Sequence, residues 1–137
     1  MKKYAAFFGY ALTSCGLLFA DPLRLVENED DETISVFRDD SSDAILVQNA
    51  RADHRPYLHP IVSPDGNGIL TEYSPGHHVH QTGLYWGFTR LNGRDYFHNP
   101  SDGYWQLVES NILAATGEVV QWETVYHLLD EEGTALM

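Results

Sequence analysis

The sequence predicts an all-β protein built as an antiparallel β-sandwich. Short runs rich in β-branched and aromatic residues recur from residue 33 onward, and turn signals separate them. These turns come at roughly the 8–12-residue spacing that is typical of sandwiches and barrels. No segment after the N-terminal apolar stretch has the periodicity of a helix, and no repeat of fixed period occurs. A chain of 137 residues is long enough for one such domain.

The first predicted strands lie before residue 75. Residues 33–37 (TISVF) favour a strand that ends at an acidic turn, and residues 44–47 (AILV) favour its antiparallel return. Residues 61–62 begin another strand, which stops at Ser63-Pro64-Asp65-Gly66. There proline presets φ and glycine accepts a positive φ, so the chain turns. Extended backbone then resumes over residues 69–73.

The strongest local prediction is a hairpin over residues 84–97. Residues 84–91 (LYWGFTRL) and 94–97 (RDYF) have the composition of paired strands, and Asn92-Gly93 separates them. An Asn-Gly pair favours a type I′ turn, because both central residues of that turn need a positive φ.

A second hairpin is predicted nearer the C-terminus. Residues 105–114 and 119–129 form its strands, with a turn at Thr116-Gly117. A further turn over 130–133 precedes what begins as a new strand over 134–137. A strand without a partner leaves its backbone groups unpaired. We therefore expect the sandwich to be incomplete at its C-terminus.

Residues 1–20 have the layout of a secretory signal peptide. Lys2 and Lys3 precede an uncharged apolar stretch that ends at Ala20, and an acidic segment follows. The stretch is short for a membrane span, and glycine and serine interrupt it. We expect a signal peptide over 1–20, a single mature domain over 21–137, and a periplasmic or secreted location.

Cys15 offers an alternative route of export. The segment Leu12-Thr13-Ser14-Cys15 resembles a bacterial lipobox, in which the cysteine is lipidated and anchors the protein. The apolar residues that follow Cys15 instead favour ordinary cleavage near Ala20. Because Cys15 is the only cysteine, the mature domain has no disulfide.

The chain is strongly acidic, with a formal net charge of −12. Removing residues 1–20 makes the remainder more negative, because that segment holds two lysines and no acid. Such a surface repels phosphate backbones, so nucleic acid is excluded as a partner. No apolar run after residue 20 is long enough to span a membrane. A neutral or cationic small molecule, such as a carbohydrate, suits this charge.

The candidate chemistry lies in a histidine-rich region. Six of the seven histidines fall between residues 54 and 98, three of them within His77-His78-Val79-His80. If this segment is a strand, His78 and His80 share a face and His77 points the opposite way. His59 becomes a third ligand if its own strand lies alongside. The sequence thus predicts that His59, His78 and His80 bind a divalent metal ion, either zinc, copper or iron.

Two other interpretations of these histidines stay open. Imidazole titrates near neutral pH, so His59, His78 and His80 are also candidate catalytic acids or bases that need no metal. They can equally be structural side chains that are hydrogen-bonded and inert. A strand-borne H-x-H pattern does not decide among the three.

Neighbouring side chains supply candidate substrate contacts. Arg55 can pair with a carboxylate, and Gln81 offers the neutral hydrogen-bonding groups that suit sugar hydroxyls. Trp86 belongs to an aromatic-rich stretch in which strand alternation sends about half of the rings inward. The outward rings would form a stacking platform for the apolar faces of pyranoses. We therefore assign Arg55, Gln81 and Trp86 as candidate substrate-binding residues.

Three segments together resemble the PmoA-like family of uncharacterised secreted bacterial proteins. They read RPYLHPIVSPDG at 55–66, HVHQTGLYWGF at 78–88 and NGRDYF at 92–97. The resemblance covers residues 50–130, and His77 departs from it by standing where the family often has aspartate. The positions that match the motifs are Arg55, His59, His78, His80 and Gln81.

The resemblance implies a β-sandwich similar to the galactose-mutarotase-like supersandwich, in a chain longer than this one. That fold often accompanies secreted sugar-degrading enzymes, although fold alone does not determine function. The family label refers to a methane oxygenase subunit, which is a membrane protein with several spans. The absence of an apolar span after residue 20 does not support that label.

We therefore expect a secreted carbohydrate-active protein. It would bind a sugar in a groove lined by histidines and aromatic rings, with acid–base or metal-assisted chemistry. The first alternative is a non-catalytic carbohydrate-binding module, in which the rings supply the affinity. The second is a metal-dependent oxygenase, as the family label suggests. The sequence leaves open whether the protein is an enzyme.

Overall fold

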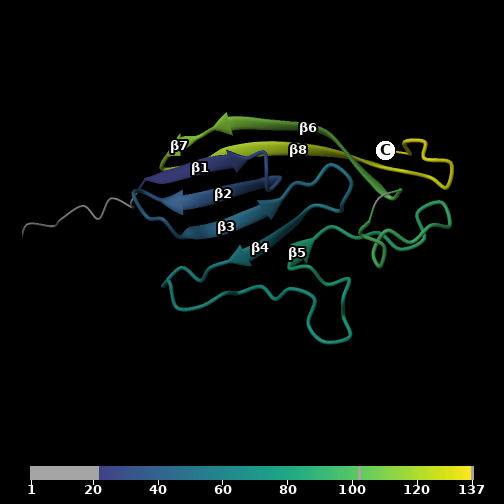
Figure 1. Ribbon diagram of the computed structural model, residues 1–137, viewed down its shortest axis with the longest axis horizontal. Coiled ribbons are helices and arrows are strands. Elements are labelled where there is room, and N and C mark those ends of the chain that lie inside the picture. The colour runs from purple at the N-terminus through teal and green to yellow at the C-terminus, as the bar shows by residue number, and fades with distance from the viewer. Residues whose placement is uncertain (1–21, 102, 137) are drawn as a thin grey trace, which may run out of the picture.

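The computed structural model describes residues 22–101 and 103–136. These residues contain eight β-strands and no helix (Figure 1), so the all-β prediction is confirmed. The strands are β1 (Leu23–Asn28), β2 (Thr33–Arg38), β3 (Ala44–Asn49), β4 (Tyr57–Ile61), β5 (Leu84–Tyr85), β6 (Trp105–Ala114), β7 (Thr116–Gly117) and β8 (Gln121–Leu128).

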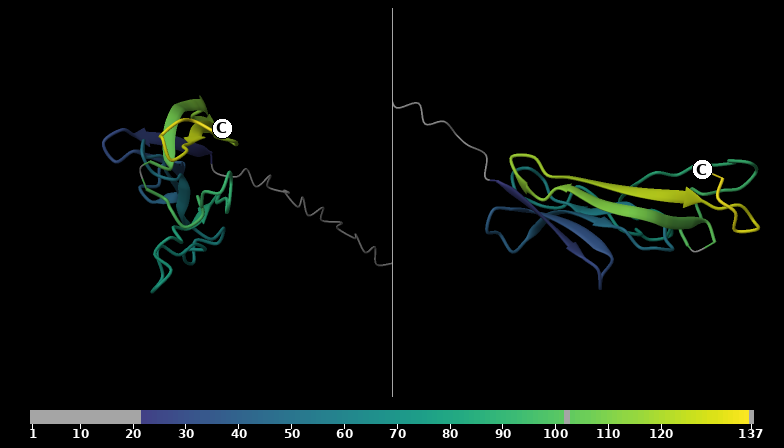
Figure 2. Two further views of the ribbon diagram at one scale, coloured as in Figure 1. Left: turned by 90° about the vertical axis from the view of Figure 1, so that its right-hand side faces the viewer. Right: turned by 90° about the horizontal axis from the view of Figure 1, so that it is seen from above.

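The strands form two sheets of unequal size. The larger sheet has the order β5-β4-β3-β2-β1-β7, and the smaller one pairs β6 with β8. All of these pairings are antiparallel. Figure 1 shows the β6–β8 pair near β1, toward the opposite end of the larger sheet from β5. Figure 2 shows the pair as a separate layer, as expected for a sandwich.

Two buried clusters hold the structure together. In the first, Leu25 and Ile34 of the larger sheet pack with Trp122 of the smaller sheet, and Ile34 is 0 % exposed. In the second, Tyr96 and Trp105 pack with the last residues of β8. Removing these apolar side chains from water is what drives the two layers together.

The sequence pattern identifies some strands well and misses others. β2, β3, β6 and β8 are confirmed close to their predicted bounds. The pattern misses β1, which pairs with β2 along its whole length. Thr116-Gly117 is a predicted turn but forms β7, because it pairs with Leu23 and Arg24 of β1. Residues 69–73 form isolated bridges at Ile69 and Tyr73 rather than a strand.

The hairpin predicted over residues 84–97 is confirmed only at its turn. Asn92 and Gly93 have φ values of 49° and 87°, as a type I′ turn requires. The prediction of long strands on either side of the turn is wrong. The structure has only β5 and an isolated bridge between Leu91 and Arg94 in this region. The physical reason is Arg90, whose φ of 61° is left-handed and interrupts the extended backbone just before the turn.

The predicted turn over 130–133 is confirmed by a hydrogen bond of 3.2 Å from the Gly133 N–H to the Asp130 carbonyl. The chain then returns along the end of β8, where Leu129 and Ala135 form an isolated bridge. The strand expected over 134–137 is reduced to this bridge within the described residues. Leu136 packs against the second buried cluster.

Two sequence predictions fall on residues that the structure does not describe. The signal peptide over 1–20 and the lipidation of Cys15 lie outside the described ranges, so both stay predictions. In residues 22–101 and 103–136, no helix has the length and apolar character needed to cross a membrane.

Candidate functional site

The histidine-rich segment folds as a turn and not as a strand. The His78 N–H donates to the Pro75 carbonyl at 2.9 Å, and the Gln81 N–H donates to the His78 carbonyl at 2.9 Å. Gly76 has a φ of 56°, a left-handed value that glycine adopts readily. The prediction that strand alternation separates His77 from His78 is therefore wrong. Their ring centroids lie 3.9 Å apart.

A histidine cluster forms around this turn, and we define it as His77, His78, His80 and His98. The ring centroid of His80 lies 6.0 Å from that of His78 and 4.6 Å from that of His98. The Nδ1 atom of His98 lies 2.7 Å from Asp95 Oδ2. The structure thus brings together His78 and His80 as expected, and it adds His98, which the sequence pattern did not assign to the site.

His59 makes its contacts away from the cluster. Its Nδ1 atom lies 2.9 Å from Thr71 Oγ1, and its ring centroid lies 5.8 Å from that of Tyr73. Across residues 22–101 and 103–136, no three His, Cys, Asp or Glu side chains are grouped so that they could hold a metal ion. The arrangement of His59, His78 and His80 expected for a metal site is therefore not assembled, because His59 lies on β4 and the other two on a separate turn.

The surroundings of His80 favour its neutral form. Partial burial lowers the pKa of His80, and Coulombic interactions with His98, His78 and Arg55 lower it further. The opposite effect of Asp95 is smaller. Since histidine ordinarily titrates just below neutral pH, a lowered pKa favours the uncharged form of His80 at neutral pH. A neutral imidazole can either donate or accept a hydrogen bond.

Arg55 is buried, and it holds loops in place where a substrate contact was expected. The side chain is 0 % exposed. Its Nη1 donates to the Phe97 carbonyl, and its Nη2 donates to the His80 carbonyl and, at 3.3 Å, to Thr82 Oγ1. Burial lowers the pKa of Arg55, and the guanidinium carbon lies 3.5 Å from the centre of the Tyr85 ring. These contacts tie the turn at His80 to the loop at Phe97.

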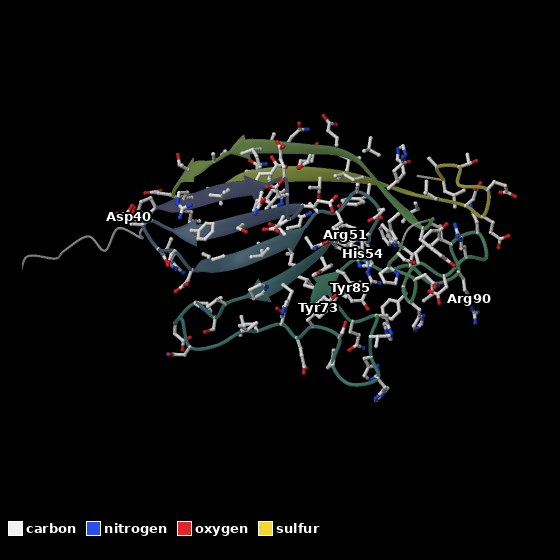
Figure 3. The ribbon with its side chains drawn as sticks, viewed as in Figure 1. Asp40, Arg51, His54, Tyr73, Tyr85 and Arg90 are labelled. Carbon is white, nitrogen blue, oxygen red and sulfur yellow. The ribbon has the colours of Figure 1, made fainter. Side chains whose placement is uncertain are left out.

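The other two candidate substrate-binding residues have different surroundings. Gln81 is half-buried, and its carbonyl accepts a hydrogen bond of 2.6 Å from the Ser74 N–H. Trp86 follows β5 directly and is 77 % exposed. Figure 3 shows Tyr85 at β5, with side chains extending from this strand and the adjoining loops. Of the predicted substrate contacts, Trp86 is the side chain most available to a ligand.

Trp86 lies at an aromatic groove that opens between the two sheets. The groove has a volume of about 760 Å³ and is bordered by β4 and β5 of the larger sheet and by β8 of the smaller one. None of the described residues that line it is a histidine. Its aromatic lining consists of Tyr57, Tyr85, Trp86, Phe88, Trp105, Trp122 and Tyr126.

The groove also has a polar element that the sequence pattern did not identify. Gln48 on β3 is 6 % exposed, and its Nε2 donates to Thr124 Oγ1 at 2.8 Å. The indole Nε1 of Trp122 donates to the Oε1 of Gln48. This network joins the two sheets and satisfies the buried amide. A glutamine inside the apolar strand AILVQN was the available signal, because a buried polar residue needs such partners.

Comparison with known proteins places the chain in a family. A model described as a family of unknown function, DUF6807, matches residues 33–137. The chain belongs to this family. The match includes every strand after β1, so the groove and the histidine cluster both lie within the family region. No curated protein and no solved structure matches the chain.

Proposed function

We propose that this DUF6807 protein binds a carbohydrate in the aromatic groove. The observation that carries the proposal is the lining of seven aromatic rings around the Gln48–Thr124 network. The apolar faces of pyranoses stack on such rings, and neutral amides and hydroxyls bond to sugar hydroxyls. A volume of about 760 Å³ suits a small ligand, since ligand pockets typically measure about 300–1,000 Å³.

The charge of the protein narrows the class of sugar. A formal net charge of −12 repels phosphorylated and sulfated ligands. The residues that line the groove carry no ionisable acid or base apart from tyrosine hydroxyls. We therefore propose that the ligand is a neutral sugar or oligosaccharide. It would be bound outside the cytoplasm if the segment 1–20 acts as a signal peptide. The resemblance to the PmoA-like family, which implies a β-sandwich similar to the galactose-mutarotase-like supersandwich, also points to a carbohydrate.

The positions of the histidines favour binding over catalysis within the groove. His59, His78 and His80 are not among the residues that line it. The hypothesis of a non-catalytic carbohydrate-binding module therefore needs only the aromatic rings of the groove and the Gln48–Thr124 network. A metal-dependent oxygenase gains no support, because no three-ligand set is assembled among the described residues. The candidate acids and bases His78 and His80 belong to the histidine cluster, which lies outside the groove.

Replacing Trp86 with alanine should weaken sugar binding about fivefold or more, because a stacked ring contributes roughly 1 kcal/mol or more at a contact. The measurement is isothermal titration calorimetry against a panel of neutral oligosaccharides, starting from the ligand that binds the parent protein best.

Leu70→Ala is the control. Leu70 is a large apolar residue that is 66 % exposed and does not line the groove, so its removal should leave the affinity unchanged. Equal losses in both variants would contradict binding in the groove. So would a parent protein that binds none of the sugars tested.

A further inference from the structure

A second site lies in the histidine cluster, where His98 and Asp95 form a close pair. Asp95 Oδ2 lies 2.7 Å from His98 Nδ1. The other oxygen, Oδ1, accepts hydrogen bonds from the backbone N–H groups of Phe97, at 2.9 Å, and of His98, at 3.2 Å. The side-chain bond to His98 lowers the pKa of Asp95, and the backbone bonds add to this effect. Both oxygens are thus engaged, and the carboxylate is fixed in direction.

This geometry determines which nitrogen of His98 carries the proton. An ionised carboxylate only accepts hydrogen bonds, so the short contact requires a proton on Nδ1. In the neutral ring, Nε2 is then left with a free lone pair. The side chain of His98 is 54 % exposed, so the ring is open to solvent and to small molecules. A base oriented by a carboxylate is the arrangement used in proton-transfer catalysis.

Arg55 holds the two loops that carry the histidine cluster. Arg55 donates to the His80 carbonyl and to the Phe97 carbonyl, and Phe97 directly precedes His98 in the chain. The ring centroids of His80 and His98 lie 4.6 Å apart as a result of this packing. A second imidazole is therefore held beside the first, close enough to contact the same small molecule.

We propose that His98, oriented by Asp95, is a general base that removes a proton from a hydroxyl group of water or of an alcohol. The O–H bond breaks, an N–H bond forms at Nε2, and Asp95 stabilises the resulting imidazolium. The oxygen, which keeps the electron pair, attacks an acyl carbon, and the imidazolium returns its proton as the leaving group departs. The substrate class is an ester. The proposal does not require a sugar in the aromatic groove.

The decisive variant is Asp95→Asn. The asparagine Oδ1 can still accept the two backbone N–H groups, so the loop is preserved. Its amide nitrogen now donates to His98 Nδ1, which moves the ring proton to Nε2 and removes the lone pair that acts as the base. Long-range ¹⁵N–¹H NMR spectra of the imidazoles should show Nδ1 protonated in the parent protein and Nε2 protonated in the variant.

Hydrolysis of p-nitrophenyl acetate supplies the second measurement. Because general-base catalysis typically contributes about 10²–10⁴-fold, Asp95→Asn and His98→Gln should each lower the rate at least about tenfold. His127→Gln is the matched control, since His127 lies on β8 outside the cluster, and its rate should equal that of the parent.

Two results would overturn the proposal. One is a parent spectrum in which His98 carries its proton on Nε2. The other is a His98→Gln variant that hydrolyses the ester as fast as the parent does. Sugar binding measured on the same His98→Gln protein should be unchanged, so a failure of the dyad is distinguishable from a failure of the carbohydrate proposal.

Discussion

Arg55→Met should lower the free energy of unfolding by about 3 kcal/mol or more. Methionine retains much of the apolar stem but removes the guanidinium. The carbonyls of His80 and Phe97 then lose a charged donor, and Thr82 Oγ1 loses a partner. The stacking of the cation on the Tyr85 ring, at 3.5 Å, is also lost. Urea unfolding followed by tryptophan fluorescence measures the change.

Arg51→Met is the control for Arg55→Met. Arg51 is an exposed arginine that lies 3.2 Å from Asp53 and 3.8 Å from Glu32. Exposed ion pairs contribute at most about 1 kcal/mol, so this variant should remain close to the parent in stability. If the two substitutions cost the same, Arg55 does not hold the loops together. The histidine NMR signals of the Arg55 variant should also shift, since the anchored turn is released.

Gly83→Ala should destabilise the protein by about 2 kcal/mol or more, through two separate effects. Gly83 has a φ of 92°, which side chains rarely adopt. A Cβ atom there would also clash with the Leu58 carbonyl oxygen and lie 2.9 Å from His59 Cβ. Relieving the clash would separate β4 from β5, because Leu58 pairs with Leu84. Thermal and urea unfolding both measure the loss.

Gly93→Ala separates the two effects. Gly93 has a similar φ of 87°, but a Cβ atom at that position has no neighbour within 4 Å. Only the cost of a left-handed backbone remains, which is about 1–2 kcal/mol. A Gly83 variant that is no less stable than the Gly93 variant would show that β4 and β5 separate without cost. The aromatic groove should be lost together with the β4–β5 pair, which makes sugar binding a second measurement.

Local composition was sufficient to predict half of the strands but not all of their partners. β2, β3, β6 and β8 are runs whose β-branched and aromatic residues favour extended backbone wherever they lie. β7 is only two residues long and forms because β1 lies beside it. The hairpin at Asn92-Gly93 shows the same contrast, since its turn is a local property. Its flanking strands depend on pairing, which the left-handed φ of Arg90 prevents.

The candidate site shows the same contrast between features that the sequence predicts and features that depend on long-range contacts. Residue type alone identified Trp86 as a candidate ligand contact and the segment 77–80 as a source of imidazoles. The position of His98 beside His80 follows from Arg55, whose hydrogen-bond partners lie 25 and 42 residues away in the chain. Arg55, which we expected to contact substrate, is 0 % exposed and hydrogen-bonded to these two loops. The periodicity of a sequence does not indicate contacts between residues that are so far apart in the chain.

The sequence by itself thus determined the all-β class, the turns and the residue types that can bind or react. Each of these follows from backbone preferences and side-chain chemistry within a few residues. Only the tertiary structure decided that the histidines and the aromatic groove are separate features, because burial and hydrogen bonding join segments that are distant in the chain. The paired His98 and Asp95 and the Gln48 network across the sheets are the two clearest results of that packing.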